Sequence, residues 1–104
     1  IHTEKRPLVT LPYTVELNDI PMMIVQHHES DVLLRRAKDQ FDRLYAEGAE
    51  RAKILSLAIH PYISGQPHRI RWLEALYEYV NGHAGVLHWN GPQMLDWYAD
   101  QPKA

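Results

Sequence analysis

The sequence predicts an α/β fold in which parallel strands alternate with crossover helices. Short apolar runs of strand length alternate with stretches of helical periodicity, in the order strand, long loop, helix, strand, helix, strand, helix. The chain has 104 residues, of which 45% are hydrophobic and none is cysteine, so it suits one globular domain with its own core. Three strands are few for a parallel sheet, and residues 1–104 are therefore expected to be a single domain or a fragment of a larger barrel or sheet.

The three expected strands are residues 7–11, 54–59 and 85–89. Each is a short, nearly continuous apolar run, as in strands that are buried on both faces. A long shaped loop follows the first strand and extends to residue 29, with room for one helical turn near residues 22–25.

Helical periodicity predicts three helices. The first covers about residues 31–47, because Ser30 can cap it and its apolar residues recur on one face before Gly48. The second opens at Pro67 and ends at residues 81–82. The last begins at residues 91–92, where Gly is followed by Pro.

Composition excludes several classes of partner. Eleven Lys and Arg against thirteen Asp and Glu give a net charge of -2, without the basic stripe that binds phosphates, so we expect no nucleic-acid partner. No apolar segment approaches the ~18 residues of a membrane span, so we expect no membrane association. The absence of cysteine fits a cytoplasmic location, although a secreted protein can also lack cysteine. The chain begins with Ile rather than Met, which favours a fragment.

His60 is the sharpest candidate for chemistry. It directly follows the second expected strand, and ligands of parallel α/β folds collect at the carboxyl ends of strands. An imidazole there can give or take a proton near neutral pH. The alternative is a histidine whose ring is satisfied by a backbone carbonyl.

A polar cluster follows the first expected strand and could bind or orient a substrate: Tyr13, Thr14, Glu16, Asn18 and Asp19. For Asn18 and Asp19 the favoured interpretation is that they close a turn. Arg69 could hold a substrate carboxylate or carbonyl, or it could simply be solvated at the surface. The spacing of His, Asp and Glu predicts no three-ligand metal site in this chain.

Two sequence segments are characteristic enough to compare with known families: LVTLPYTVELND at residues 8–19 and LSLAIHPYISGQPHR at residues 55–69. Together with GPQMLDWY at residues 91–98, they resemble the C-terminal half of the polysaccharide deacetylase family, in the branch with allantoinase and peptidoglycan deacetylases. The resemblance implies a distorted (β/α) barrel that hydrolyses a non-peptide C–N bond of an N-acetylated sugar or a cyclic amide such as allantoin. It gives His60 the role of the general acid and places residues 13–19 on the substrate side.

The resemblance also implies what this chain lacks. In members that use metal, an aspartate and two histidines from the first half of the barrel hold zinc or a similar divalent ion, and that half is absent here. We therefore expect no cofactor in this chain and no activity from it alone. The alternative is a non-catalytic half-barrel module that binds a partner chain or itself. Exposed parallel edges predict a homo-oligomer or a complementing N-terminal half in either case. A third interpretation is an independent small α/β binding domain.

Overall fold

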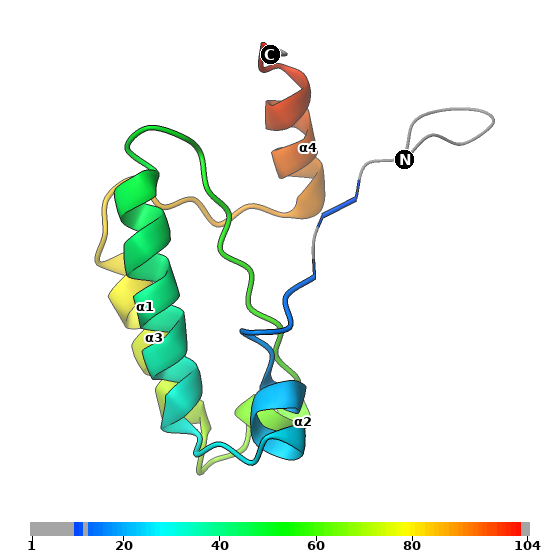
Figure 1. Cartoon of the computed structure of the whole chain (residues 1–104), viewed down its shortest axis with the longest axis vertical. Helices are drawn as coiled ribbons and strands as arrows, with labels where there is room; N and C mark the ends of the chain where they lie inside the picture. Colours follow the sequence, from blue (N-terminus) through cyan, green and yellow to red (C-terminus); the bar gives the residue numbers. More distant parts are fainter. Residues whose placement is uncertain (1–9, 12, 103–104) are drawn as a thin grey trace, which may run out of the picture. The chain divides into compact units, whose positions relative to one another are not determined.

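The computed structural model describes residues 10–11 and 13–102 of the chain. Its regular elements are a π-helix and four α-helices (Figure 1): η1 (Ile20–Val25), α1 (Asp31–Glu47), α2 (Pro61–Ser64), α3 (Ile70–Asn81) and α4 (Gly91–Ala99). Residues 13–84 form one compact unit, and α4 belongs to a second unit with residues 10–11.

Helix α1 confirms the predicted helix over residues 31–47, but the expected Ser30 cap is wrong, because the Ser30 side chain makes no capping hydrogen bond and its hydroxyl accepts from Arg69 instead. Its buried side chains, Leu33, Ala37 and Phe41, recur every four residues and so line one face. Asp31 lies in the first turn, where a negative charge stabilises the helix dipole. The helix ends at Gly48, whose N–H donates to the Leu44 carbonyl at 2.8 Å.

Helix α3 begins three residues later than Pro67, the predicted start. Residues 67–69 form a turn instead, because the Arg69 and Ile70 amides both donate to the Gln66 carbonyl at 2.9 Å. Helix α3 lies beside α1 (Figure 1) and buries Leu76 and Val80.

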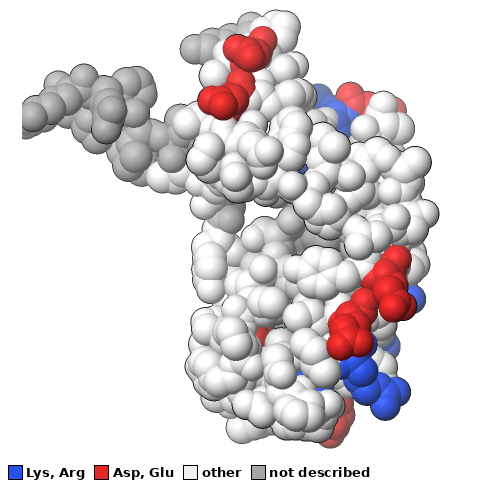
Figure 2. All heavy atoms as spheres, turned by 180° about the vertical axis from the view of Figure 1, so that it is seen from behind, with Lys and Arg blue, Asp and Glu red and all other residues white. Residues whose placement is uncertain are grey.

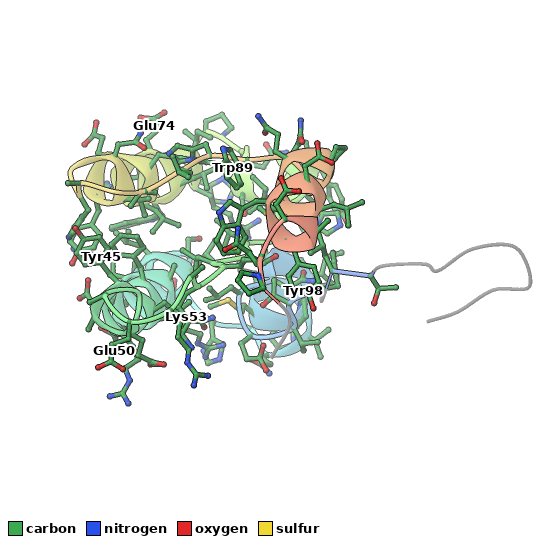
Figure 3. All side chains as sticks on the ribbon, turned by 90° about the horizontal axis from the view of Figure 1, so that it is seen from above. Tyr45, Glu50, Lys53, Glu74, Trp89 and Tyr98 are labelled. Carbon is green, nitrogen blue, oxygen red and sulfur yellow. The ribbon has the colours of Figure 1, made fainter. Side chains whose placement is uncertain are left out.

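Aromatic rings fill one end of the seam between α1 and α3, where Figure 3 shows Tyr45. The His83 ring lies 4.9 Å from Phe41, 5.0 Å from Tyr45 and 4.8 Å from Tyr79, measured between centroids. The Tyr45 hydroxyl also donates to the Ala84 carbonyl at 2.8 Å. These contacts fasten the C-terminal ends of the two helices together.

Two ion pairs lie on the exposed surface of α1. Figure 2 shows acidic and basic groups over the α1–α3 pair and acidic groups on α4, with much of the remaining surface in view uncharged. Along α1, Arg35 pairs with Asp31 at 3.4 Å and Arg43 with Glu47 at 2.8 Å, both at i,i+4 spacing. These pairs occupy the solvated face that the amphipathic pattern predicts.

A second apolar cluster surrounds η1. Met22, Met23, Leu33 and Ile63 are buried together, so η1, α1 and α2 share one core. The predicted turn near residues 22–25 is present, but it is a π-helix in which the Gln26 amide donates to the Pro21 carbonyl at 2.9 Å. π-Helical turns are rare in proteins, and many of those that occur lie at functional sites.

The strand predictions for residues 54–59 and 85–89 are wrong, since the described part of the chain contains no regular strand. Residues 7–9 of the first expected strand lie outside the described residues, and residues 10–11 belong to no strand. One isolated parallel bridge joins Asn18 and Ala58. Its direction agrees with the predicted parallel pairing, but the described residues close no barrel. A strand requires a neighbour along its length, and within residues 10–11 and 13–102 the run 54–59 has one at a single position.

Helix α4 confirms the last predicted helix and starts with a capping box. The Asn90 side chain accepts from the Gln93 amide at 3.0 Å, and the Gln93 side chain accepts from the Asn90 amide at 2.9 Å. None of the helices described is both long and apolar enough to span a bilayer.

Candidate active site

The most completely enclosed polar group of the described chain is the Asp19 carboxylate, which is 0% exposed. Its Oδ1 lies 2.8 Å from Nδ1 of His60. Its Oδ2 accepts from the His60 backbone N–H at 2.7 Å and from the Ser64 hydroxyl at 2.8 Å. Two residues from one short segment therefore satisfy both carboxylate oxygens, and we call Asp19, His60 and Ser64 the carboxylate cluster.

The parallel bridge brings the members of the carboxylate cluster together. The Ala58 amide donates to Leu17 at 2.8 Å, and the Asp19 amide donates to Ala58 at 3.1 Å, so Asp19 is held beside the segment that carries His60. His60 itself has an extended backbone, with φ -125° and ψ 130°, and is the N-cap of α2. Pro61 then starts the helix, a position at which its missing N–H costs nothing.

Helix α2 returns Ser64 toward the carboxylate one turn later. The Ser64 amide donates to the His60 carbonyl at 3.0 Å, which fixes the spacing between the two side chains. Gly65 ends the helix, and a Cβ there would lie 2.5 Å from the Pro61 carbonyl oxygen. A side chain at this position would therefore clash with the backbone of the first residue of α2.

The bond to Asp19 determines the tautomer of His60. An ionised carboxylate has only acceptors, so the hydrogen of the His60–Asp19 contact belongs to Nδ1 of the imidazole. Nε2 is then the nitrogen that remains for chemistry. The side chain of His60 is 31% exposed, so the ring is not sealed in the core. The alternative that a backbone carbonyl satisfies the ring is wrong, because the partner is a carboxylate.

Asn18 and Asp19 differ in what they do. The Asn18 side chain accepts from the Ile20 amide and donates to the Thr14 carbonyl, both at 3.2 Å, which agrees with the turn-closing interpretation. For Asp19 that interpretation is wrong, since its carboxylate bonds to residues 41 and 45 positions away. Both side chains are buried, and their polar atoms bond within the protein.

Among the described residues, none of the other predicted substrate contacts forms a hydrogen bond or an ion pair with His60. Tyr13 is 70% exposed, the Glu16 side chain is exposed, and Thr14 accepts from the Leu17 amide at 3.1 Å. Arg69 is half-buried and donates to the Ser30 hydroxyl at 3.2 Å, at the start of α1.

Sequence reasoning missed two neighbours of His60. Ser64 is one, and its signal was its position one helical turn beyond His60. Tyr62 is the other: its exposed ring packs edge-on against the His60 ring with centroids 5.8 Å apart. An aromatic residue two positions after His60 is visible in the sequence but carries no specific signal by itself.

The described residues do not fit a metal centre. No group of three His, Cys, Asp or Glu side chains that could hold an ion occurs in residues 10–11 and 13–102. The carboxylate cluster contains two side chains of the kinds that commonly bind metal, Asp19 and His60. The Asp19 oxygens already accept three hydrogen bonds within the protein.

Comparison with known proteins gives the relationship. No family model matches the chain. A curated protein of Schizosaccharomyces pombe, described as a candidate polysaccharide deacetylase, is 35% identical over 85 residues, which are 80% of this chain and 27% of that protein. The crystal structure of a probable polysaccharide deacetylase from Pseudomonas aeruginosa PAO1 matches 99% of this chain and 35% of its own, at 30% identity and a TM-score of 0.86.

This chain is a relative of the polysaccharide deacetylases. The crystal structure of Puue allantoinase is also similar, with 35% identity, a TM-score of 0.80, and coverage of 90% of this chain and 32% of that one. The resemblance that residues 8–19 and 55–69 predict is thus confirmed. As a polysaccharide deacetylase relative, the chain spans about a quarter of the curated protein and about a third of each solved structure.

Proposed function

We propose that this chain carries the proton-donating side of a hydrolase site that cleaves non-peptide C–N bonds. The bond would belong to an N-acetylated sugar or to a cyclic amide such as allantoin. The names of the relatives support this class of reaction. The observation that carries the proposal is the His60 ring, which is held at Nδ1 by a buried carboxylate and reaches solvent with part of its surface.

The arrangement suits general acid catalysis. In the protonated ring, Nδ1–H donates to Asp19 and Nε2–H faces the substrate. After water has added to the amide carbon, the C–N bond breaks, the departing nitrogen takes the Nε2 proton, and His60 is left neutral. The adjacent carboxylate stabilises the imidazolium before that transfer and holds the ring in one orientation.

The remaining parts of such a site belong to other residues. Activation of the water, and any divalent metal ion, would come from protein outside the described residues, in agreement with the partial coverage of each relative. Tyr13, Thr14 and Glu16 remain our candidates for substrate contact, together with Arg69. The first three lie just before the bridge that positions Asp19.

One observation favours the non-catalytic alternative. The extended run 54–59 pairs with another described segment at Ala58, and Ile54 in it is 55% exposed. An apolar run that pairs at one position among the described residues is suited to pairing with another chain. A module that associates with itself or with a partner would use this edge.

The decisive test uses the complete polypeptide that contains this chain. With allantoin and an N-acetylated chitooligosaccharide as substrates, we expect His60→Ala to lower kcat about 100-fold or more, because proton transfer to the leaving group is lost. His68→Ala removes an exposed histidine of the same loop region and should leave kcat unchanged. We expect no turnover from the 104-residue chain alone. Equal rates for wild type and His60→Ala, or turnover by the 104-residue chain, would refute the proposal.

A further inference from the structure

We infer that Ser64 is a positioning residue that fixes the Asp19 carboxylate, and through it the Nδ1–H tautomer of His60. The inference rests on the proposed function only where it concerns catalysis. Ser64 lies 45 positions from Asp19 in the sequence and forms no hydrogen bond with the His60 ring through its side chain. We infer that it nevertheless influences which ring nitrogen of His60 carries the hydrogen.

The first step is that Ser64 is built into the site. Its side chain is buried, at 2% exposure, and its hydroxyl donates to Oδ2 of Asp19 at 2.8 Å. Its backbone N–H donates to the His60 carbonyl, and Gly65 allows the tight end of α2. The backbone of α2 therefore fixes the position of the Ser64 hydroxyl.

The second step concerns which oxygen faces the ring. Without Ser64, both hydrogen bonds to the carboxylate come from His60, one from its backbone and one from its ring. Ser64 adds a donor from a different side chain to Oδ2, so Oδ2 takes two donors and Oδ1 is left for Nδ1. This division resists rotation of the carboxylate plane.

The third step is the consequence of removing the hydroxyl. Ser64→Ala leaves a lone pair of a fully buried carboxylate oxygen without a donor, which is unfavourable. The carboxylate can then turn or admit water, and either change weakens its bond to Nδ1. The neutral ring should spend more time with its hydrogen on Nε2 instead.

The experiment is ¹⁵N NMR of the 104-residue chain labelled at histidine, at a pH of about 8.5, where an ordinary histidine is neutral. We expect the wild type to show a protonated Nδ1 and an unprotonated Nε2 at His60. In Ser64→Ala the two ¹⁵N shifts should move toward each other as the second tautomer becomes populated. Ser64→Thr keeps the hydroxyl and should retain the wild-type shifts.

A second variant covers the case in which Ser64→Ala does not fold. Ser64→Cys replaces the hydroxyl with a weaker donor of similar shape, so it should give a smaller convergence of the two shifts. Wild-type shifts in Ser64→Ala, or in Ser64→Cys if the alanine variant is unfolded, would overturn the inference. An equal convergence in Ser64→Thr and Ser64→Ala would also overturn it.

These measurements separate the inference from the proposed function, because they need no substrate. If the shifts converge as expected while His60→Ala leaves kcat of the complete polypeptide unchanged, the proposed function fails and the positioning role stands. If His60→Ala lowers kcat and the shifts of Ser64→Ala stay at the wild-type values, the proposed function stands and the positioning role of Ser64 fails.

Discussion

At the residue scale, Asp19 shows how a buried charge is accommodated. A carboxylate at 0% exposure is unfavourable unless donors replace its water, and here a ring N–H, a backbone N–H and a hydroxyl do so. In surroundings of low dielectric these bonds are stronger than they would be in water. The buried carboxylate is thus bonded to His60 and Ser64 within the protein.

Gly65 provides a residue-scale prediction. Gly65→Ala places a Cβ within 2.5 Å of the Pro61 carbonyl oxygen, which is backbone and cannot step aside. We expect a loss of about 1–3 kcal/mol in the free energy of unfolding, measured by urea denaturation. The His60 ¹⁵N shifts should also change, because α2 carries Ser64.

The matched control is Gly91→Ala, where the nearest atom to the added Cβ is Leu11 Cδ1 at 3.8 Å. That change should alter the free energy of unfolding by less than about 0.5 kcal/mol, as do substitutions that meet no close contact. Equal stability losses in the two variants would contradict the steric role of Gly65.

The sequence predicts His60 and names Asp19 among the candidate site residues, but it predicts neither the bond between them nor the contribution of Ser64. A histidine that ends an apolar run is visible because its signal is local. The bond between His60 and Asp19 joins positions 41 residues apart, and which side chain fills the space beside a ring depends on how two segments pair. Asp19 therefore looked like a turn residue among its own neighbours, where Asn18 does close the turn.

At the element scale, helices α1 and α3 are joined by a polar bond as well as by rings. The Tyr79 hydroxyl of α3 donates to the Asp42 carboxylate of α1, and the Lys38 Nζ lies 4.4 Å from the Tyr79 ring centroid. This hydrogen bond to Asp42 is the main reason that the pKa of Tyr79 is raised above its ordinary value, with desolvation and the charges of Asp42 and Asp39 adding to it.

The stability of the α1–α3 pair should depend on pH through Tyr79. A raised pKa of Tyr79 in the folded state means that folding favours the neutral phenol. The resulting stabilisation is complete below the unfolded-state pKa of about 10 and is lost as the pH rises through the folded-state value. Asp42→Asn should lower the pKa of Tyr79 toward its ordinary value, as measured by ¹³C NMR titration of the Tyr79 ring.

Asp39→Asn is the control, since Asp39 acts on Tyr79 through its charge and is the weakest of these causes. It should lower the pKa of Tyr79 less than Asp42→Asn does. A larger effect from Asp39→Asn would show that the bond between α1 and α3 is not what raises the pKa.

The elements themselves differ in how well the sequence predicts them. Helix α1 follows from its periodicity and α4 from its capping box, both of which are properties of neighbouring residues. The apolar run 54–59 predicts a strand with equal clarity, yet it pairs at Ala58 alone among the described residues. Composition shows that a segment is suited to a sheet, but a ladder also needs a partner along its length.

At the scale of the whole molecule, an apolar run that pairs at one position among the described residues predicts association. Ile54 in this run is 55% exposed. We expect the 104-residue chain to self-associate, with a weight-average mass in sedimentation velocity that rises with concentration. Ile54→Lys should reduce that rise, because a charge on an exposed edge opposes pairing.

Val25→Lys is the matched control, since Val25 is an exposed apolar residue of η1 rather than of the extended run. It should leave the concentration dependence unchanged. A wild-type chain that sediments as a monomer at every concentration would contradict the expected role of the extended edge.

The link between Asp19 and His60 also makes the site a reporter of chain closure. The carboxylate and the ring lie 41 positions apart in the sequence and meet only after the chain between them has looped back, an event that local helix formation does not supply. A time-resolved signal from the His60 Nδ1–H would therefore register the meeting of the two segments, and with it the formation of the tertiary fold.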